Sequence, residues 1–561
     1  MQDKVYTKIW QKYEKCKDYL DKQRLVKKTE RNWNFYIGNQ WVGCNTGGEE
    51  LPILNFISPI VRYKTAIVSQ NSMTAKYSDI ENRADLQPIY ELLNQNFAKN
   101  WEKSKMDSKT WDIIKSAAIQ GDSYAYWGSD RTDMPPKILP NTSVLFGDEN
   151  ITELQEQPFI IIRERLEVEA VRRIAKENGI PKKDIELIVG DSNSDANEGV
   201  ILNNYEVSNK VTSLLYMTKE NGVVKVARST AQCVYEPLHA IEGDVTGLHS
   251  YPICSMLWEP MPYNARGVSE VAQMIPNQLE VNKTAARRAI TVKLCAFPRI
   301  AYDSTVVPNP EDLDTVGKPI AVNGGGSQSV SQAVSYLNAT NISSDAKNLQ
   351  DDLLQTTKDL AGASDYAMGN VNPEQASGQA IIAVRDSAQV PLNENVARYK
   401  QFVEDVALLW FDMWVAYHPE GIEVASTNDM GEEVQVLIDQ KQLQELKPTV
   451  RIDVSQDNQW TKLSEQQWLD NMFDRQQLSL EEYAELAPDN GSVPKGKLRA
   501  VLAKREAMMA KQQQQQQQSG ENFARMVLDL VSQGIQQEDA IALVQQQLFS
   551  QEAAQQAAFN N

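Results

Sequence analysis

Histidine is scarce in this chain of 561 residues, which contains three: His239, His249 and His418. The first two stand ten positions apart, and no carboxylate or cysteine accompanies them at a spacing that suggests zinc. The strings GxSxG and HExxH, which mark serine hydrolases and zinc proteases, do not occur. We therefore expect no catalytic residue, no metal site and no cofactor, and a protein that is not an enzyme.

Two short strings come near a ligand-binding motif and fail at the residues that matter. Residues 191–195 have the spacing that opens a calcium loop, but Ala196 replaces the required glycine and Leu202 replaces the bidentate glutamate. Residues 323–327 are glycine-rich but have no lysine where a phosphate loop needs one. Plain polar and flexible loops are the better interpretation of both strings.

Cysteine and long apolar runs are also scarce. The five cysteines form no CxxC pair, and the first residues contain no apolar targeting segment, so we expect reduced thiols in a cytosol. They are Cys16, Cys44, Cys233, Cys254 and Cys295. The best membrane candidate, residues 402–417, is short and contains Glu404, Asp405 and Asp412. It is expected to be a buried amphipathic helix, with no membrane as partner.

Basic residues are outnumbered, 56 Lys and Arg against 75 Asp and Glu, which gives a net charge of −19. Tight wrapping around nucleic acid needs clustered basic residues, so this balance argues against it. Residues 4–36 are the exception, with ten basic and four acidic side chains on an expected helix. That helix either has a solvated basic face or contacts a capsid or scaffold partner.

The spacing of apolar residues predicts an α+β fold that is mainly helical. Expected helices cover residues 4–36, 57–70, 86–103, 109–119, 168–178, 345–361 and 377–418, and expected strands cover residues 123–127, 143–146, 159–163, 211–218, 223–229, 435–439 and 450–454. Asn221-Gly222 predicts a tight hairpin turn, and Pro391 must start a new helical segment or kink the long one. After residue 460 the chain is expected to be helical again, with 16 glutamines in its last 61 residues.

Two segments are the most informative. Residues 261–294 read as a helical segment initiated by Gly267, in which Gln278 and Asn282 recur four residues apart. Residues 362–385 form a long Gly, Pro and Asn break between two helices. Neither pattern carries catalytic chemistry.

Six short strings, taken with those two segments, resemble the portal proteins of tailed bacteriophages, especially of the short-tailed type. They follow in the expected order over residues 30–455. The strings are residues 31–41 (RNWNFYIGNQW), 55–61 (NFISPIV), 121–128 (GDSYAYWG), 140–148 (PNTSVLFGD), 267–283 and 376–380 (ASGQA).

The resemblance implies a portal fold with wing, stem, clip and crown regions, assembled as a ring. The implied regions are the wing (1–266), a first stem segment (267–295), the clip (296–342), a second stem segment (343–361), a tunnel loop (362–376), a long wing helix with return strands (377–459) and a helical crown with a Gln-rich C-terminal extension (460–561). Within the two stem segments, the helices are expected at about residues 276–295 and 345–361.

The resemblance also implies a function. A portal is the ring channel at one capsid vertex for genome packaging, DNA retention and ejection, and it is assembled in the host cytoplasm into the virion. Its implied partners are further copies of itself, typically in a homododecamer, double-stranded DNA bound non-specifically, the terminase large subunit, a head–tail adaptor, and the major capsid and scaffolding proteins. The alternative is another structural virion component, such as a head–tail connector or a minor capsid protein.

Two groups of residues are implied to face DNA. The tunnel-loop candidates are Asp365, Asn370, Asn372, Glu374 and Gln375. The candidates for a basic ring on the first stem helix are Lys283, Arg287, Arg288 and Lys293. The second stem helix has an acidic excess, so the two helices could pair within or between subunits, or their charges could be solvated.

Overall fold

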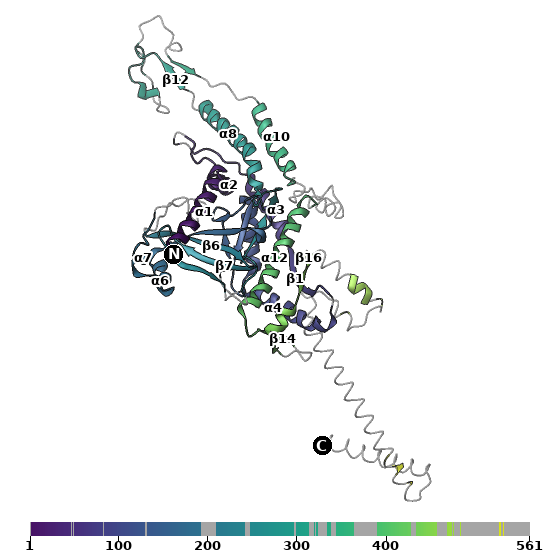
Figure 1. The fold of residues 1–561 in the computed structure, drawn as a ribbon. Helices are drawn as coiled ribbons and strands as arrows, with labels where there is room; N and C mark the ends of the chain where they lie inside the picture. The colour runs from purple at the N-terminus through teal and green to yellow at the C-terminus, as the bar shows by residue number, and fades with distance from the viewer. Residues whose placement is uncertain are drawn as a thin grey trace, which may run out of the picture. The chain divides into compact units, whose positions relative to one another are not determined.

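The computed structural model describes residues 2–45, 50–81, 83–128, 132–191, 209–241, 247–296, 299–313, 334–337, 344–363, 390–427 and 433–456, together with isolated positions between and after these ranges. The chain divides into two compact units, Met1–Ser455 and Gln456–Asn561. Nearly all of the second unit, with the expected helical crown, lies outside the described residues. The first unit is mixed α+β, as expected (Figure 1).

The expected helix over residues 4–36 is two helices, α1 (Gln2–Lys22) and α2 (Leu25–Ile37). The prediction of one helix is wrong because Arg24 adopts a left-handed conformation, with φ of 54°, between them. The break lets α1 pack on the five-stranded sheet while α2 packs against α5 and α8. Neither glycine nor proline marks this break in the sequence.

The predicted helical pattern of the next region is confirmed. The helices are α3 (Ile57–Gln70), α4 (Gln87–Lys103) after the short 3₁₀ turn η1 (Ala84–Leu86), and α5 (Met106–Gln120). Their apolar sides meet α12 in the largest core of the unit, where Leu93, Ile113 and Trp410 are fully buried. Trp410 packs among aromatic rings there, with its ring centroid 5.1 Å from that of Phe97 and 6.1 Å from those of Trp101 and Trp127.

Two antiparallel sheets have more than two strands among the residues that the structure describes. The five-stranded sheet has the order β4 (Val144–Phe146), β5 (Phe159–Glu167), β6 (Lys210–Glu220), β7 (Val223–Ser229), β8 (Val234–Ala240). The three-stranded sheet has the order β3 (Lys137–Leu139), β2 (Asp122–Tyr126), β9 (Ile253–Leu257). The predicted β6–β7 hairpin is confirmed, because Asn221 and Gly222 have φ of 55° and 81°, as a tight primed turn requires.

Two short helices follow strand β5: α6 (Val168–Glu177), which confirms the expected helix over residues 168–178, and α7 (Lys182–Glu186). They pack with Val211 and Tyr235 in a separate small core beside the five-stranded sheet. Short 3₁₀ turns lie at η2 (Leu154–Glu156) and η4 (Pro310–Leu313).

The long helix α12 (Asn393–Tyr417) starts directly after the turn η5 (Val390–Leu392), which contains Pro391. Residues 377–389 of the expected helix lie outside the described residues. The predicted aromatic stripe of α12 is buried, with Phe402, Trp410 and Trp414 at 1% exposure or less. In the part of the chain that is described, no helix combines the length and apolar character that crossing a membrane requires.

Return strands follow α12. They are β14 (Ile422–Thr427) and β15 (Glu433–Ile438), which form a hairpin, then α13 (Gln440–Glu445) and β16 (Pro448–Gln456). The last strand pairs with β1 (Asn71–Asp79), far away in sequence. Strands β15 and β16 extend the two expected segments, whereas β1 and β14 were not predicted.

Candidate functional site

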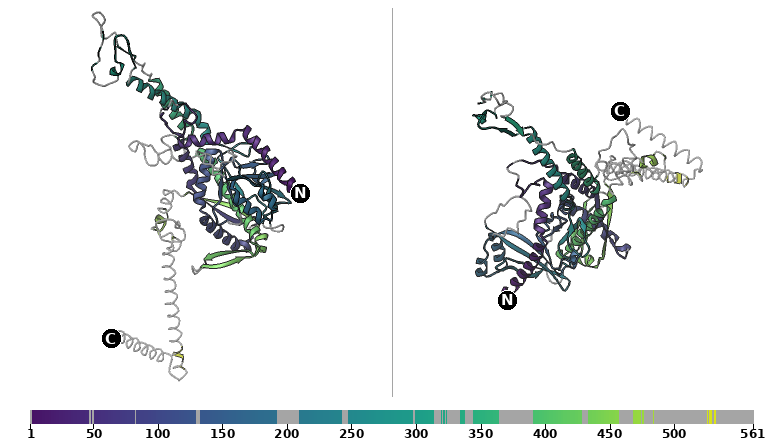
Figure 2. Two further views of the ribbon diagram at one scale, coloured as in Figure 1. Left: turned by 90° about the vertical axis from the view of Figure 1, so that its left-hand side faces the viewer. Right: turned by 90° about the horizontal axis from the view of Figure 1, so that it is seen from above.

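Two helices, α8 (Glu270–Ala296) and α10 (Asp345–Leu360), lie side by side and run antiparallel (Figures 1 and 2). Asn277 Nδ2 donates to Thr357 Oγ1 at 2.9 Å, and Arg288 NH1 donates to the Gln350 side chain at 3.0 Å. From the first contact to the second, the residue number rises on α8 from 277 to 288 and falls on α10 from 357 to 350, so the two helices are antiparallel. Strands β12 (Arg299–Tyr302) and β13 (Val334–Leu337) pair at the far end of α8 from the sheets.

The start of α8 differs from the expectation. The helix begins at Glu270 rather than near Pro276, and Gly267 belongs to strand β11 (Gly267–Val268), which pairs with β10 (Glu259–Pro260). Ser269 caps the helix, because its hydroxyl accepts a hydrogen bond from the Ala272 N–H at 3.2 Å. Pro276 lies inside the helix.

A buried amide cluster attaches α8 to the body. Gln278 and Asn282, at 0% and 1% exposure, lie one turn apart on the same face. The Gln278 side chain donates to Leu54 O at 2.8 Å and accepts from Phe56 N at 3.1 Å. Asn282 accepts from Leu54 N at 3.0 Å and donates to Gln40 Oε1. The two amides that the sequence presents as polar helix positions therefore bind the backbone of residues 54–56, which belong to no helix or strand and end in the buried Phe56.

Gly121 and Gly267 are in contact just before the start of α8. A Cβ at Gly267 would lie 2.2 Å from Gly121 O, and one at Gly121 would lie 2.4 Å from Gly267 O. Gly121 also has φ of 107°, and its carbonyl accepts from Trp258 N at 2.9 Å. The Ser269 hydroxyl donates to Ile119 O at 2.6 Å. The end of α5 and the start of α8 are thus in backbone contact that side chains at either glycine would prevent.

A buried charge cluster precedes α8. Arg266 binds both carboxylate oxygens of Glu149, at 2.9 and 3.0 Å, and donates to Asn141 O and Val144 O, each at 2.7 Å. Its NH1 lies 3.4 Å from Asp122 Oδ2. Burial raises the pKa of Asp122, and Arg266 opposes that rise. The cluster joins both sheets to the residue before β11.

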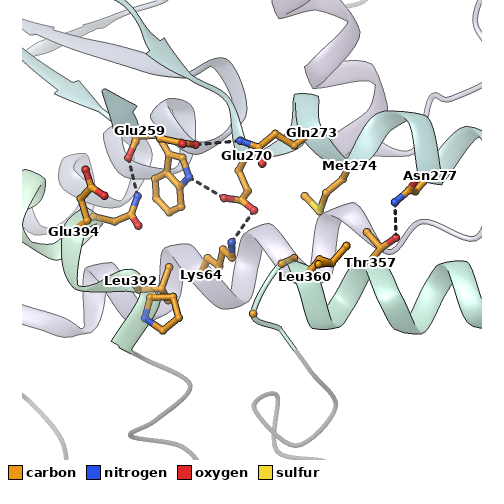
Figure 3. Close-up of a pocket in the computed structure, with 15 residues that line it drawn as sticks. Lys64, Glu259, Glu270, Gln273, Met274, Asn277, Thr357, Leu360, Leu392 and Glu394 are labelled. Carbon is orange, nitrogen blue, oxygen red and sulfur yellow. Dashed lines mark hydrogen bonds and ion pairs between the residues drawn. The ribbon is translucent and has the colours of Figure 1, made fainter. Parts of the chain in front are cut away.

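A pocket of about 380 Å³ lies where α10 ends and α12 begins (Figure 3). Lys64 Nζ lies 2.7 Å from one oxygen of Glu270, and Trp258 Nε1 donates to the other at 3.0 Å. Both oxygens of this carboxylate are engaged, which favours a structural role for it. Gly362 and Pro391 both line the pocket, so the chain leaves α10 and returns to α12 at the same place.

The four candidates for a basic ring do not share one face of α8. Lys283 and Arg287 lie 3.8 and 3.6 Å from the Glu280 carboxylate on an exposed face. Arg288 is turned about 100° from Arg287 and contacts Gln350 on α10. Their assignment as DNA contacts stays a prediction.

The remaining candidates divide between described and undescribed residues. Lys293 is exposed in the last turn of α8, turned about 120° from Arg287. The predicted tunnel-loop residues lie outside the described residues: Asp365, Asn370, Asn372, Glu374 and Gln375.

The residues examined for other chemistry have structural partners. His249 Nδ1 lies 3.3 Å from Asp412, and His239 Nδ1 lies 2.9 Å from Pro237 O. Asp191, from the calcium-like string, accepts from Thr212 N at 3.0 Å. Within the described ranges, no group of three or more His, Cys, Asp or Glu is arranged to hold a metal ion. Cys16, Cys44, Cys233 and Cys254 form no disulfide.

Comparison with known proteins gives structural likeness alone. No family model matches the chain, and no curated protein matches it. The chain is similar to a chain in the virion of a native gene transfer agent particle, with a TM-score of 0.32 and 10% identity over 76% of this chain and 88% of that one.

Two further solved structures are similar. One is the neck of an empty gene transfer agent particle computed with C6 symmetry, with a TM-score of 0.31 and 11% identity over 75% of this chain and 86% of that one. The other is the neck of the native particle computed with C12 symmetry, with a TM-score of 0.30 and 11% identity over 76% and 88%. At these TM-scores the likeness carries no argument about function.

Proposed function

We propose that this chain is the subunit of a portal ring in a phage-like particle. Many copies would surround one channel at a capsid vertex, through which DNA is packaged, retained and ejected. The ring is structural and does no catalysis, because the motor that hydrolyses ATP is a separate terminase. Docking sites for the terminase large subunit and a head–tail adaptor belong to the same proposal.

One observation carries the proposal: four of the six strings that resemble portal proteins meet in space around the base of α8, while residues 376–380 lie outside the described residues. Residues 31–41 and 55–61 supply Gln40 and Phe56 to the amide cluster of residues 267–283. Residues 121–128 contact the start of the same segment through backbone. Short strings scattered over the sequence therefore have one structural task, which is to hold the base of a long projecting helix.

The arrangement around that helix supports the same function. An antiparallel pair, α8 and α10, projects from the body, and the short strands β12 and β13 lie at its far end. This order matches an implied stem with a clip at its tip. The predicted tunnel loop would start at Gly362, at the pocket that closes the base of the pair.

The charge balance suits a conduit. A duplex that moves through a ring needs weak, non-specific contacts, because every strong phosphate contact resists movement. A net charge of −19 per copy keeps such contacts few. Any contact of the few basic side chains on α8 with DNA phosphates would then be confined to the part of the channel beside that helix.

Negative-stain electron microscopy of the purified full chain tests the proposal. We expect rings with an axial opening, and a stable complex when the purified terminase large subunit is added. A monomer or compact small oligomer without an opening would overturn the portal assignment. Rings that fail to bind terminase would favour a head–tail connector instead.

The tunnel-loop role has its own test. Deleting residues 367–374 should leave ring assembly intact and impair DNA packaging or retention in the particle. The matched control replaces the same eight residues with Gly and Ser, which keeps the loop length. Particles that fill normally and keep their genomes after the deletion would show that this role is wrong.

A further inference from the structure

Helices α8 and α10 each present an exposed charged face that the other helix does not cover. On α8, Lys283 and Arg287 lie one turn apart, with side chains 49% and 69% exposed. They point about 110° away from the side that carries Asn277 and Arg288 and contacts α10. Glu280 is the acidic residue on this face, so two positive charges stand against one negative charge.

The exposed face of α10 has the opposite sign. Asp345, Asp352 and Asp359 recur every seven residues and are all exposed. They lie on one face that points about 150° away from Gln350 and Thr357, the residues that contact α8. This face has three acidic side chains, and no basic residue of the helix lies on it.

Both lysines of α10 belong to another side of the helix. Lys347 and Lys358 are turned about 120–140° from the face that holds Asp352. Asp351 is on their side and so balances part of their charge. The acidic excess of α10 is therefore concentrated on the outward face.

Each charged face also exposes a large aliphatic side chain. Ile290 on α8 is 43% exposed beside Lys283 and Arg287, and Leu349 on α10 is 50% exposed beside Asp352. Single exposed aliphatic residues are ordinary on a protein surface, and Val292 and Leu360 on the same helices are more exposed still. The opposite charges of the two faces therefore carry the inference.

The two faces match in height along the helix pair. Lys283 and Arg287 lie between the two cross-helix contacts that start at Asn277 and Arg288, and Asp352 lies between the partners of those contacts on α10. Ile290 and Leu349 both lie just beyond the second contact, towards β12. Rotation about a ring axis parallel to the helices leaves these heights unchanged.

We infer that the Lys283, Arg287 and Ile290 face of one copy binds the Leu349, Asp352 and Asp359 face of the next copy. This inference rests on the proposed function, since a ring needs contacts between two different faces of the subunit. Asp352, at the height of Lys283 and Arg287, sets the register between neighbours, and Asp359 extends the acidic face beyond the Asn277–Thr357 contact, towards the base of the pair. Lys283 and Arg287 are thereby assigned to the contact between copies rather than to DNA.

Charge reversal on one helix at a time tests the contact. Lys283→Glu with Arg287→Glu leaves both outward faces acidic, and Asp352→Lys with Asp359→Lys leaves both with a net positive charge. Each double variant alone should lose rings at concentrations where the wild-type chain forms them, as measured by light scattering after size exclusion and by negative stain.

Mixing supplies the decisive result. The two variants combined one to one should form alternating rings, because each acidic α8 face then meets a basic α10 face. The chain that carries all four substitutions should also recover rings by itself. Such recovery additionally shows that the variants are folded.

Three outcomes would overturn the inference. If either double variant formed rings with the yield of the wild-type chain, these faces would not form the contact between copies, and the portal proposal would stand. Normal rings from Lys283→Glu with Arg287→Glu that fail to pass DNA would assign both side chains to the channel. A wild-type chain without rings would overturn the inference and the proposed function together.

Discussion

Replacing Arg266 by methionine should destabilise the first unit strongly. The guanidinium lies over the Phe146 ring at 4.8 Å, and its side chain is 9% exposed. Methionine keeps most of the aliphatic part of the arginine side chain and removes the five N–H donors of the guanidinium. What remains is Glu149 at 11% exposure and Asp122 at 1%, without their cation.

Loss of one partner from a buried ion pair costs about 3–5 kcal/mol, because the other charge stays buried. Asn141 O and Val144 O also lose a donor, at about 1–3 kcal/mol for each buried acceptor left unsatisfied. Asp122 moderates the total: burial already raises its pKa, and without Arg266 that pKa rises further, so the carboxyl takes a proton. We expect a loss of about 4 kcal/mol in the free energy of unfolding.

Urea unfolding followed by tryptophan fluorescence measures this loss for Arg266→Met, Glu149→Gln and the double variant. The double variant should be more stable than the sum of the single losses predicts, by about 2 kcal/mol, because it removes both charges together. The matched control is Lys103→Met, which breaks an exposed 3.7 Å pair with Asp133 and should cost at most about 0.5 kcal/mol. Additive effects of the two single changes would refute the coupling between Arg266 and Glu149.

Three further predictions concern other contacts. Burial raises the pKa of Asp405 to about 6, so the folded state binds an extra proton between about pH 4 and 6, and stability is lost as the pH rises through that range. Asp405→Asn should flatten this part of the profile of urea midpoint against pH, and it should stabilise the fold at neutral pH by up to about 3 kcal/mol. The control is Glu102→Gln, which changes an exposed carboxyl and should have neither effect. Gly267→Ala should cost about 3 kcal/mol in the same unfolding assay, because its Cβ meets the Gly121 carbonyl, and an unchanged midpoint would contradict that contact. Gln278→Leu should cost about 1–3 kcal/mol, because it leaves the buried Phe56 N–H without an acceptor, and no loss would mean that water replaces the amide.

The elements that the sequence predicts correctly are those formed by interactions between residues close together in the chain. The helix over residues 57–70 and the turn at Asn221-Gly222 need nothing beyond apolar spacing and positive-φ residues. The break at Arg24 was not predictable, because docking of α1 and α2 on different surfaces imposes it on an ordinary residue. The start of α8 at Glu270, capped by Ser269, was not predicted, because the resemblance placed the helix from about residue 276.

The candidate site was harder to predict for a different reason. Gln278 and Asn282 look like surface amides in the sequence, and only their partners at Gln40, Leu54 and Phe56, more than 220 residues away, reveal their burial. No periodicity connects such distant positions. The resemblance strings contain these residues, but the reason for each residue became clear only from the contacts between strings.

The position of these contacts separates two kinds of effect along α8. Three buried attachments hold its base: the amide cluster, the Gly121–Gly267 contact and the Arg266 cluster. None of them uses the exposed face around Arg287. Substitutions at the base should therefore change the stability of one chain and leave the complementarity between chains unaltered. Charge reversals further along α8 should do the opposite, because exposed side chains contribute little to the stability of the single chain. In the proposed ring, the buried contacts at the base of α8 would hold the helix in place, and its exposed face would bind the neighbouring copy.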